Sequence, residues 1–184
     1  MEITKTSLSD CIIIKSQIFT DSRGYFFECY NDQHFNQLTG LKVQFVQDNQ
    51  SFSTKGVLRG LHLQSGEHAQ AKLVRVLKGE VLDVAVDLRK NSPTYGKYES
   101  VILSEDNKLQ FFVPRGFAHG FVVLSDVAEF FYKVDNYYHK EAEVGIHYAD
   151  PTLNIDWQLP AELLKVSDKD AILPFLAEIS NHLS

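Results

Sequence analysis

Residues 72–88 read KLVRVLKGEVLDVAVDL, which consists of apolar runs joined at Gly79. In the second run Asp83 alternates with its apolar neighbours Leu82 and Val84, with the period of two that side chains have in a β-strand. A short connection that contains glycine is typical of a tight turn between strands. The stretch therefore predicts a pair of β-strands that form a hairpin.

Runs of the same kind recur between residues 11 and 135, and turn residues separate them. They are CIIIKSQIF (11–19), YFFECY (25–30), VQFV (43–46), GVLRGLHLQ (56–64), YESVIL (98–103), KLQFFV (108–113), HGFVVL (119–124) and AEFFYKV (128–134). So many short strands at close spacing indicate a β-sandwich or a β-barrel.

Helical signals are few. Asn31 or Asp32 is suited to cap the start of a short helix that runs through Leu38 and ends at Gly40. The last segment carries an apolar stripe at helical spacing that is expected to pack on the sheet, formed by Leu173, Leu176, Ile179 and Leu183. Pro174 should start or kink that helix. Because no repeat or linker interrupts the pattern, we expect residues 1–184 to form a single domain.

Composition restricts the partners and the compartment. A formal net charge of −6 argues against a general nucleic-acid-binding protein, which needs a broad basic face. No apolar run approaches the roughly 20 residues that cross a bilayer, and residues 1–10 lack the order of a signal peptide. We therefore expect a cytoplasmic protein with no nucleic-acid or membrane partner.

Cys11 and Cys29 form no CxxC pair and are expected to be reduced core residues.

Polar side chains concentrate in residues 47–51, 59–64 and 114–120. By strict alternation Arg59 and His62 fall on opposite faces of their strand, unless Gly60 marks a β-bulge that re-aims one of them. A cation inside an apolar strand must be paired or meet an anionic ligand, which makes Arg59 a candidate binding residue. A lone histidine is more often a packed residue than a functional one. His62 and His119 are therefore candidate functional residues only because of the residues around them.

A metal site is the obvious rival, because His62 and His119 resemble ligands of the metal-binding cupins. Residues 114–119 fit the Pro-x-Gly-x-x-His part of the cupin pattern. The earlier part does not fit, because Gln64 replaces a histidine and Lys72 stands where a carboxylate ligand is expected. An ammonium group there would repel a divalent cation. We expect a cupin-like scaffold without a metal ion, with a metal-dependent cupin oxygenase or isomerase as the rival interpretation.

Several segments together, in the same order and with matching spacing, resemble the dTDP-4-dehydrorhamnose 3,5-epimerases; they are residues 21–28, 47–51, 58–62, 72–79, 114–121 and 167–170. The resemblance implies an all-β, cupin-like double-stranded β-helix (jelly roll) with a short N-terminal helix and a C-terminal helical segment. It also implies an isomerase without a cofactor. Such an enzyme inverts C3 and C5 of dTDP-4-keto-6-deoxy-D-glucose to give dTDP-4-dehydro-L-rhamnose through an enolate.

The resemblance also implies catalytic roles. His62 is the base that removes the protons next to the C4 ketone, and Asp170 orients His62 and stabilises its imidazolium form. Lys72 opposes the negative charge that develops on the C4 oxygen as the enolate forms. Tyr132 is the proton donor on the other face of the sugar.

Binding roles carry over in the same way. The diphosphate is expected to contact Arg23, Arg59 and Asn49. The thymine is expected to contact Glu28, Gln47 and the stacked ring of Tyr138. His119 is expected to contact the sugar, with Glu143 and Lys169 as further substrate contacts. In this family Arg23 and Glu28 reach into the neighbouring subunit's site, which implies a homodimer with exchanged N-terminal strands.

The sequence departs from the family pattern at a few positions. Leu63 stands where tyrosine is common, Ala71 where glycine is common, and residues 147–149 read HYA where RWN or RWD is frequent. These changes leave open an enzyme that epimerises only C3 or only C5, or one that accepts a related nucleotide-ketosugar. A non-catalytic sugar-nucleotide-binding domain is a further alternative, against which the intact His62 and Asp170 count.

Overall fold

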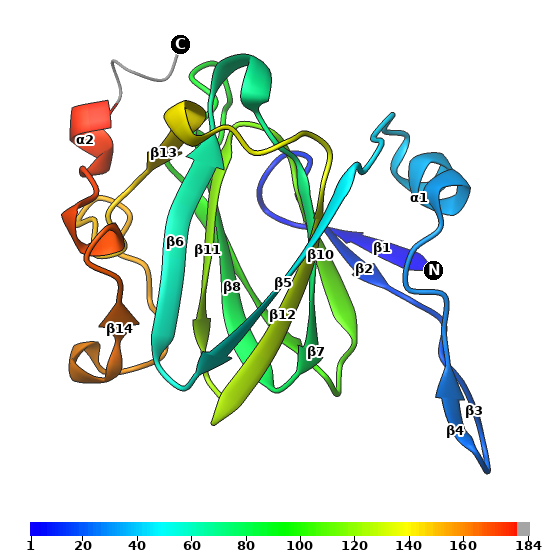
Figure 1. Ribbon diagram of the computed structural model, residues 1–184. Helices are drawn as coiled ribbons and strands as arrows, with labels where there is room; N and C mark the ends of the chain where they lie inside the picture. The colour runs from blue at the N-terminus through cyan, green and yellow to red at the C-terminus, as the bar shows by residue number, and fades with distance from the viewer. Residues whose placement is uncertain (180–184) are drawn as a thin grey trace.

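The computed structural model describes residues 1–179, which fold into β-sheets that lie face to face (Figure 1). The first sheet has the order β1-β2-β10-β7-β12-β5, with β1 Glu2–Lys5, β2 Ile12–Lys15, β10 Leu109–Val113, β7 Lys72–Lys78, β12 Val127–Val134 and β5 Gln47–Thr54. The second has the order β13-β6-β11-β8-β9, with β13 Glu143–Gly145, β6 Val57–Gln64, β11 Phe117–Val123, β8 Glu80–Asp87 and β9 Tyr98–Ser104, while β14 Lys165–Val166 pairs with β6. This architecture confirms the predicted all-β, cupin-like jelly roll.

Apolar side chains of both sheets meet in a core between them, including Val74, Phe111 and Phe130 of the first sheet and Val81, Ala85 and Phe117 of the second. The outer face of the second sheet is also covered. There Trp157, Leu176 and Ile179 of the C-terminal segment pack on side chains such as Leu82 and Val84. Strands buried on both faces read as nearly continuous apolar runs, which explains the sequence of β8.

The predicted hairpin across Gly79 is wrong. Strand β7 pairs with β10 and β12 of the first sheet, whereas β8 pairs with β9 and β11 of the second. Gly79, with a φ of 77°, carries the chain from one sheet to the other, and Val127 leaves no room there for a side chain. Alternation places the side chains of a strand but does not say which strand lies beside it, so the pairing could not be deduced.

The strand predictions need further corrections around residues 11–54. Residues 43–46 form no strand, and the run 11–19 is divided between β2 and β3, which is Phe19–Asp21. Cys11 is buried as predicted, but Cys29 is exposed and lies outside any strand. The polar residues 47–54 do form a strand, β5, in which exposed side chains alternate with more buried ones.

The helix α1, Asp32–Thr39, confirms the predicted N-terminal helix. The side chain of Asn31 caps it by accepting a hydrogen bond from the His34 backbone N–H, and Gly40 ends it in the left-handed conformation. Within residues 1–179 no helix is long and apolar enough to span a membrane.

The helix α2, Leu176–Ile179, begins two residues after Pro174 and buries Leu176 and Ile179. Leu173 precedes this helix instead of lying on it, since it follows the 3-10 helix η4, Asp170–Ile172. Leu183 lies outside the described residues. The predicted apolar stripe is therefore confirmed only in its middle part.

A short hairpin of β3 and β4, Gly24–Phe26, projects from the body of the molecule on the same side as α1 (Figure 1). Its aromatic side chains are exposed, with relative exposures of 56% for Phe19, 60% for Tyr25 and 70% for Phe26. An exposed aromatic cluster of this kind usually marks an interaction surface.

Candidate active site

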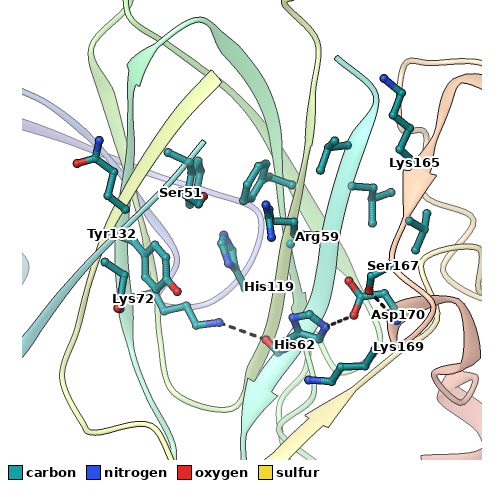
Figure 2. A pocket seen from close by; sticks show the side chains of 18 residues that line it. Ser51, Arg59, His62, Lys72, His119, Tyr132, Lys165, Ser167, Lys169 and Asp170 are labelled. Carbon is teal, nitrogen blue, oxygen red and sulfur yellow. Dashed lines mark hydrogen bonds and ion pairs between the residues drawn. The ribbon is translucent and has the colours of Figure 1, made fainter. Parts of the chain in front are cut away.

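A cavity of about 660 Å³ opens between the sheets. Its lining draws on β5, β6, β7, β11 and β12 and on the segment around η4, and it includes Asn49, Arg59, His62, Lys72, His119, Tyr132, Lys169 and Asp170. Figure 2 shows these charged and aromatic side chains around the same space. Of the residues predicted to act in catalysis, all four lie here.

Strand β6 presents Arg59 and His62 to this cavity together, because it contains a β-bulge. In the pairing of β6 with β11, His62 lies opposite His119 and Arg59 lies opposite Phe121. Two residues of β6 therefore span the distance that a single residue, Gly120, spans in β11. The bulge shifts the alternation by one position and confirms the hypothesis about Gly60.

The bulge requires glycine in both strands. Gly60 has a φ of 131°, and a Cβ atom added there would lie 2.5 Å from Gly120 Cα. A Cβ atom added at Gly120 would lie 2.6 Å from the Arg59 carbonyl oxygen. Only glycine allows the backbones to approach this closely, so the glycines position the side chains beside them.

His62 is held by a buried carboxylate. His62 Nε2 lies 2.7 Å from Asp170 Oδ1 (Figure 2). The Gly60 backbone N–H donates to Asp170 Oδ2 at 3.4 Å. Burial lowers the pKa of His62, while the charge of Asp170 acts in the opposite direction. The ring is therefore neutral near pH 7 and can accept a proton, after which Asp170 stabilises the imidazolium form.

Lys72 and Tyr132 come from β7 and β12 of the first sheet, whereas His62 comes from the second sheet. The Lys72 ammonium group donates to the His62 carbonyl oxygen at 3.3 Å. Burial lowers the pKa of Lys72 to about 8, against the influence of Asp83 and Glu143. Burial raises the pKa of Tyr132, which keeps its phenol protonated near neutral pH. A neutral imidazole and a protonated phenol thus come from the two opposing sheets around the cavity, with an ammonium group near the imidazole.

A smaller cavity of about 200 Å³ adjoins the first and shares Asn49, His62, Lys72 and Tyr132 with it. Its polar lining is completed by Gln47, Gln64, Gln70, Tyr138 and Glu143. The Glu143 carboxylate accepts hydrogen bonds from the Tyr138 hydroxyl at 2.7 Å and from Lys169 Nζ at 2.6 Å. The predicted binding residues of this chain's own site therefore line these two adjoining cavities.

Arg23 and Glu28 are the predicted site residues that the fold does not bring to the cavities. Arg23 lies at the tip of the β3–β4 hairpin and pairs with Asp21 at 2.6 Å. Glu28 accepts a hydrogen bond from Asn31 and pairs with His34 near the start of α1. Within one chain these side chains lack access to the site.

Reasoning from the sequence missed Asp83. Both oxygens of its carboxylate lie within hydrogen-bonding distance of His119 Nε2, at 2.9 and 3.0 Å. The sequence pattern showed only that it alternates with apolar residues, and in the structure its side chain is fully buried. The signal that pointed to Arg59, a charge inside an apolar strand, applied to Asp83 as well. Lys165 and Ser167, which also line the larger cavity, carried no signal of this kind.

The histidines of the cavity are each engaged by an aspartate. Among residues 1–179 no group of three or more histidine, cysteine, aspartate or glutamate side chains is arranged to hold a metal ion.

The sequence model of the dTDP-4-dehydrorhamnose 3,5-epimerases matches residues 5–178. A solved structure of dTDP-4-dehydrorhamnose 3,5-epimerase from Elizabethkingia anophelis is 57% identical to this chain, with a TM-score of 0.94 and 97% of each chain covered. A solved structure of dTDP-6-deoxy-D-glucose-3,5-epimerase from Legionella pneumophila in complex with dTDP-4-keto-L-rhamnose is 51% identical, with a TM-score of 0.95, covering 99% of this chain and 96% of that one. The dTDP-4-dehydrorhamnose 3,5-epimerase of Salmonella typhimurium is 53% identical over 176 residues, 96% of each protein. The chain therefore belongs to the dTDP-4-dehydrorhamnose 3,5-epimerase family.

Proposed function

We propose that this chain inverts C3 and C5 of dTDP-4-keto-6-deoxy-D-glucose and so forms dTDP-4-dehydro-L-rhamnose. Both carbons are bonded to the C4 carbonyl carbon, so removal of either hydrogen as a proton gives an enolate. Return of a proton to the opposite face of that carbon inverts it. The reaction needs a base, an acid on the other face and a group that stabilises the negative oxygen.

The observation that carries this proposal is the placement of His62 and Tyr132 on opposite sheets around one cavity. In the proposed reaction His62 takes the proton and Asp170 stabilises the resulting imidazolium. Tyr132 delivers a proton from the other wall of the cavity. Its burial supports this role, because a raised pKa keeps the phenol protonated until the enolate forms.

Lys72 is proposed to lie beside the C4 oxygen. A positive charge there stabilises the enolate more than the neutral ketone, and this difference lowers the barrier. Removal of a single oxyanion-stabilising group costs about 10²- to 10³-fold in kcat in other enzymes. We expect a loss of that size in Lys72→Met.

The nucleotide is proposed to occupy the space that leads from the larger cavity into the smaller one. Arg59 and Asn49 bind the diphosphate, which explains how a chain with a net charge of −6 holds an anion. Gln47 and Tyr138 bind the thymine, and His119, Glu143 and Lys169 make further contacts with the substrate.

Arg23 and Glu28 are proposed to serve the site of a second copy of this chain, in a homodimer with exchanged N-terminal strands. Support comes from the projecting β3–β4 hairpin with its exposed aromatic residues. It also comes from the fact that neither Arg23 nor Glu28 lines either cavity of its own chain. Each site then needs residues from both subunits.

The activity is tested by incubating the protein with dTDP-4-keto-6-deoxy-D-glucose in deuterated water. We expect deuterium at C3 and at C5 of the product, and no entry above background with His62→Ala. Label at only one carbon would reveal a single-site epimerase, and no exchange at either carbon with the wild type would reject the proposed reaction. Elemental analysis of protein purified without chelators tests the metal-dependent alternative, which requires about one metal ion per chain.

Subunit mixing tests the exchanged homodimer. We expect Arg23→Ala and His62→Ala each to lose activity alone, and a refolded mixture of the variants to regain activity. In mixed dimers one site combines an intact His62 with an intact Arg23 from the other subunit, so about a quarter of all sites recover. A mixture that stays as inactive as its components would contradict the exchange.

A further inference from the structure

Asp83 is a buried charge in an apolar setting. Its exposed fraction is 0%, and its neighbours Leu82 and Val84 in β8 are apolar and buried. Transfer of an unpaired carboxylate into such an environment costs several kcal/mol. A carboxylate that persists there must therefore be compensated by nearby hydrogen bonds and positive charge.

The first compensating group is His119 on β11. Its Nε2 atom lies 2.9 Å and 3.0 Å from the two carboxylate oxygens of Asp83. An ionised carboxylate can only accept hydrogen bonds, so Nε2 carries the proton. This fixes the orientation of the ring and, when the imidazole carries a single proton, places that proton on Nε2 and leaves Nδ1 as an acceptor. His119 itself lines the larger cavity.

The second compensating group is Lys72. Burial alone drives its ammonium group toward the neutral form, and the negative charge of Asp83 is the largest influence in the opposite direction. Charged and titratable side chains that approach Lys72 come from several strands, namely His62 of β6, Asp83 of β8, His119 of β11, Tyr132 of β12 and Glu143 of β13. Of these Asp83 is the one buried acid without exposure to solvent.

We propose that Asp83 is a positioning residue for the epimerisation. It holds His119 in a single tautomer against the sugar, and it places a negative counter-charge behind the cavity wall that His119 and Lys72 share. This inference rests on the proposed function, since it assigns Asp83 to the support of His119 and Lys72 in that reaction.

The same strand offers a matched control. Asp87 is also fully buried in β8, but its carboxylate is held by Arg89, Ser92 and Thr94, away from the lining of the larger cavity. Asp87→Asn therefore removes a buried charge from β8 without changing the surroundings of Lys72 or His119. A purely structural role for Asp83 predicts that both substitutions have the same consequences.

The test compares D83N with D87N. In each variant the Lys72 side chain is titrated with pH, and NMR of protein with ¹³C-labelled lysine monitors the titration. We expect the midpoint for Lys72 to fall by about one pH unit in D83N, because an opposite charge at close range is lost, and to stay unchanged in D87N. The alkaline limb of the kcat profile should move by the same amount in D83N, so that kcat above that limb drops roughly tenfold. KM should change less than kcat.

An unchanged Lys72 midpoint and pH profile in D83N would overturn the inference, even if D83N were less stable. The NMR titration needs no turnover, so it remains decisive if the wild type shows no deuterium exchange and the proposed function fails. Should D83N not fold, the double variant D83N/K72M replaces it. We expect the double variant to fold, because it lacks both charges. If the double variant does not fold while K72M alone does, the proposal that Asp83 acts as a counter-charge to Lys72 is contradicted.

Discussion

His62 Nε2 lies 2.7 Å from Asp170 Oδ1, although 108 residues separate them in the chain. The pair forms because η4 packs beside β6, where the Gly60 backbone N–H also contacts the Asp170 carboxylate. The result is a neutral imidazole with a fixed orientation, and we expect the activity of the enzyme to depend on this pair.

Asp170→Asn should lower kcat by about 10²- to 10⁴-fold, because the amide neither stabilises the imidazolium form nor fixes the tautomer of His62. The variant should fold, since asparagine has nearly the same shape. Glu141→Gln is the control, because Glu141 pairs with the exposed His139 at 3.3 Å outside the cavities. Equal activities of Asp170→Asn and Glu141→Gln would contradict the role of Asp170.

Tyr132→Phe removes one hydroxyl group and should separate proton removal from inversion. We expect His62 still to take protons, so deuterium enters recovered substrate, while product formation falls by about 10²-fold or more. Tyr137→Phe, at an exposed position, should change neither the rate of deuterium incorporation nor the rate of product formation. If Tyr132→Phe forms product at the rate of the wild type, another group is the acid.

The activity should decrease at low pH and again at high pH. His62 must be neutral, and burial lowers its pKa, so activity should rise with pH and reach its plateau no higher than the ordinary range of histidine. Lys72 must be charged, and its pKa is lowered to about 8, so activity should fall as the pH rises through that value. Lys72→Arg should remove the alkaline fall, because a guanidinium stays protonated. A wild-type profile of kcat/KM that is flat from pH 7 to about 10 would contradict the role of Lys72.

Gly60→Ala should destabilise the protein far more than Gly24→Ala. The φ angles are 131° and 132°, but an added Cβ atom meets Gly120 in the first case and nothing within 4 Å in the second. The backbone cost of about 1 to 2 kcal/mol is common to both, whereas overpacking adds roughly 1 to 3 kcal/mol only at Gly60. Urea unfolding measures the difference, and equal losses would show that the bulge tolerates a side chain.

Much of the fold could be predicted because alternation and turn residues locate strands directly. The cap at Asn31 and the end at Gly40 located α1 in the same way, since both act locally. The path across Gly79 could not be predicted, because a hairpin and a crossing between sheets need the same glycine and the same alternation. The exposure of Cys29 was missed for a related reason, as an aromatic neighbourhood in sequence does not guarantee burial.

The site was predicted partly from the residues and partly from resemblance. Gly60 signalled the bulge that turns Arg59 and His62 to one side, which is a local property of the strand. The pairing of His62 with Asp170 depends on contacts between distant segments, and only the family pattern indicated it. Asp83 was missed because alternation alone cannot tell an outer face exposed to water from an inner one.

The central claim is that His62 and Tyr132 face opposite sides of a ketosugar whose C4 oxygen lies beside Lys72. A crystal structure of the enzyme with bound dTDP-4-keto-L-rhamnose tests it most directly. The account predicts the His62 ring on one face, the Tyr132 hydroxyl on the other, and Lys72 Nζ about 3 Å from the C4 oxygen. A sugar with both side chains on the same face, or with Lys72 turned away from the C4 oxygen, would contradict it.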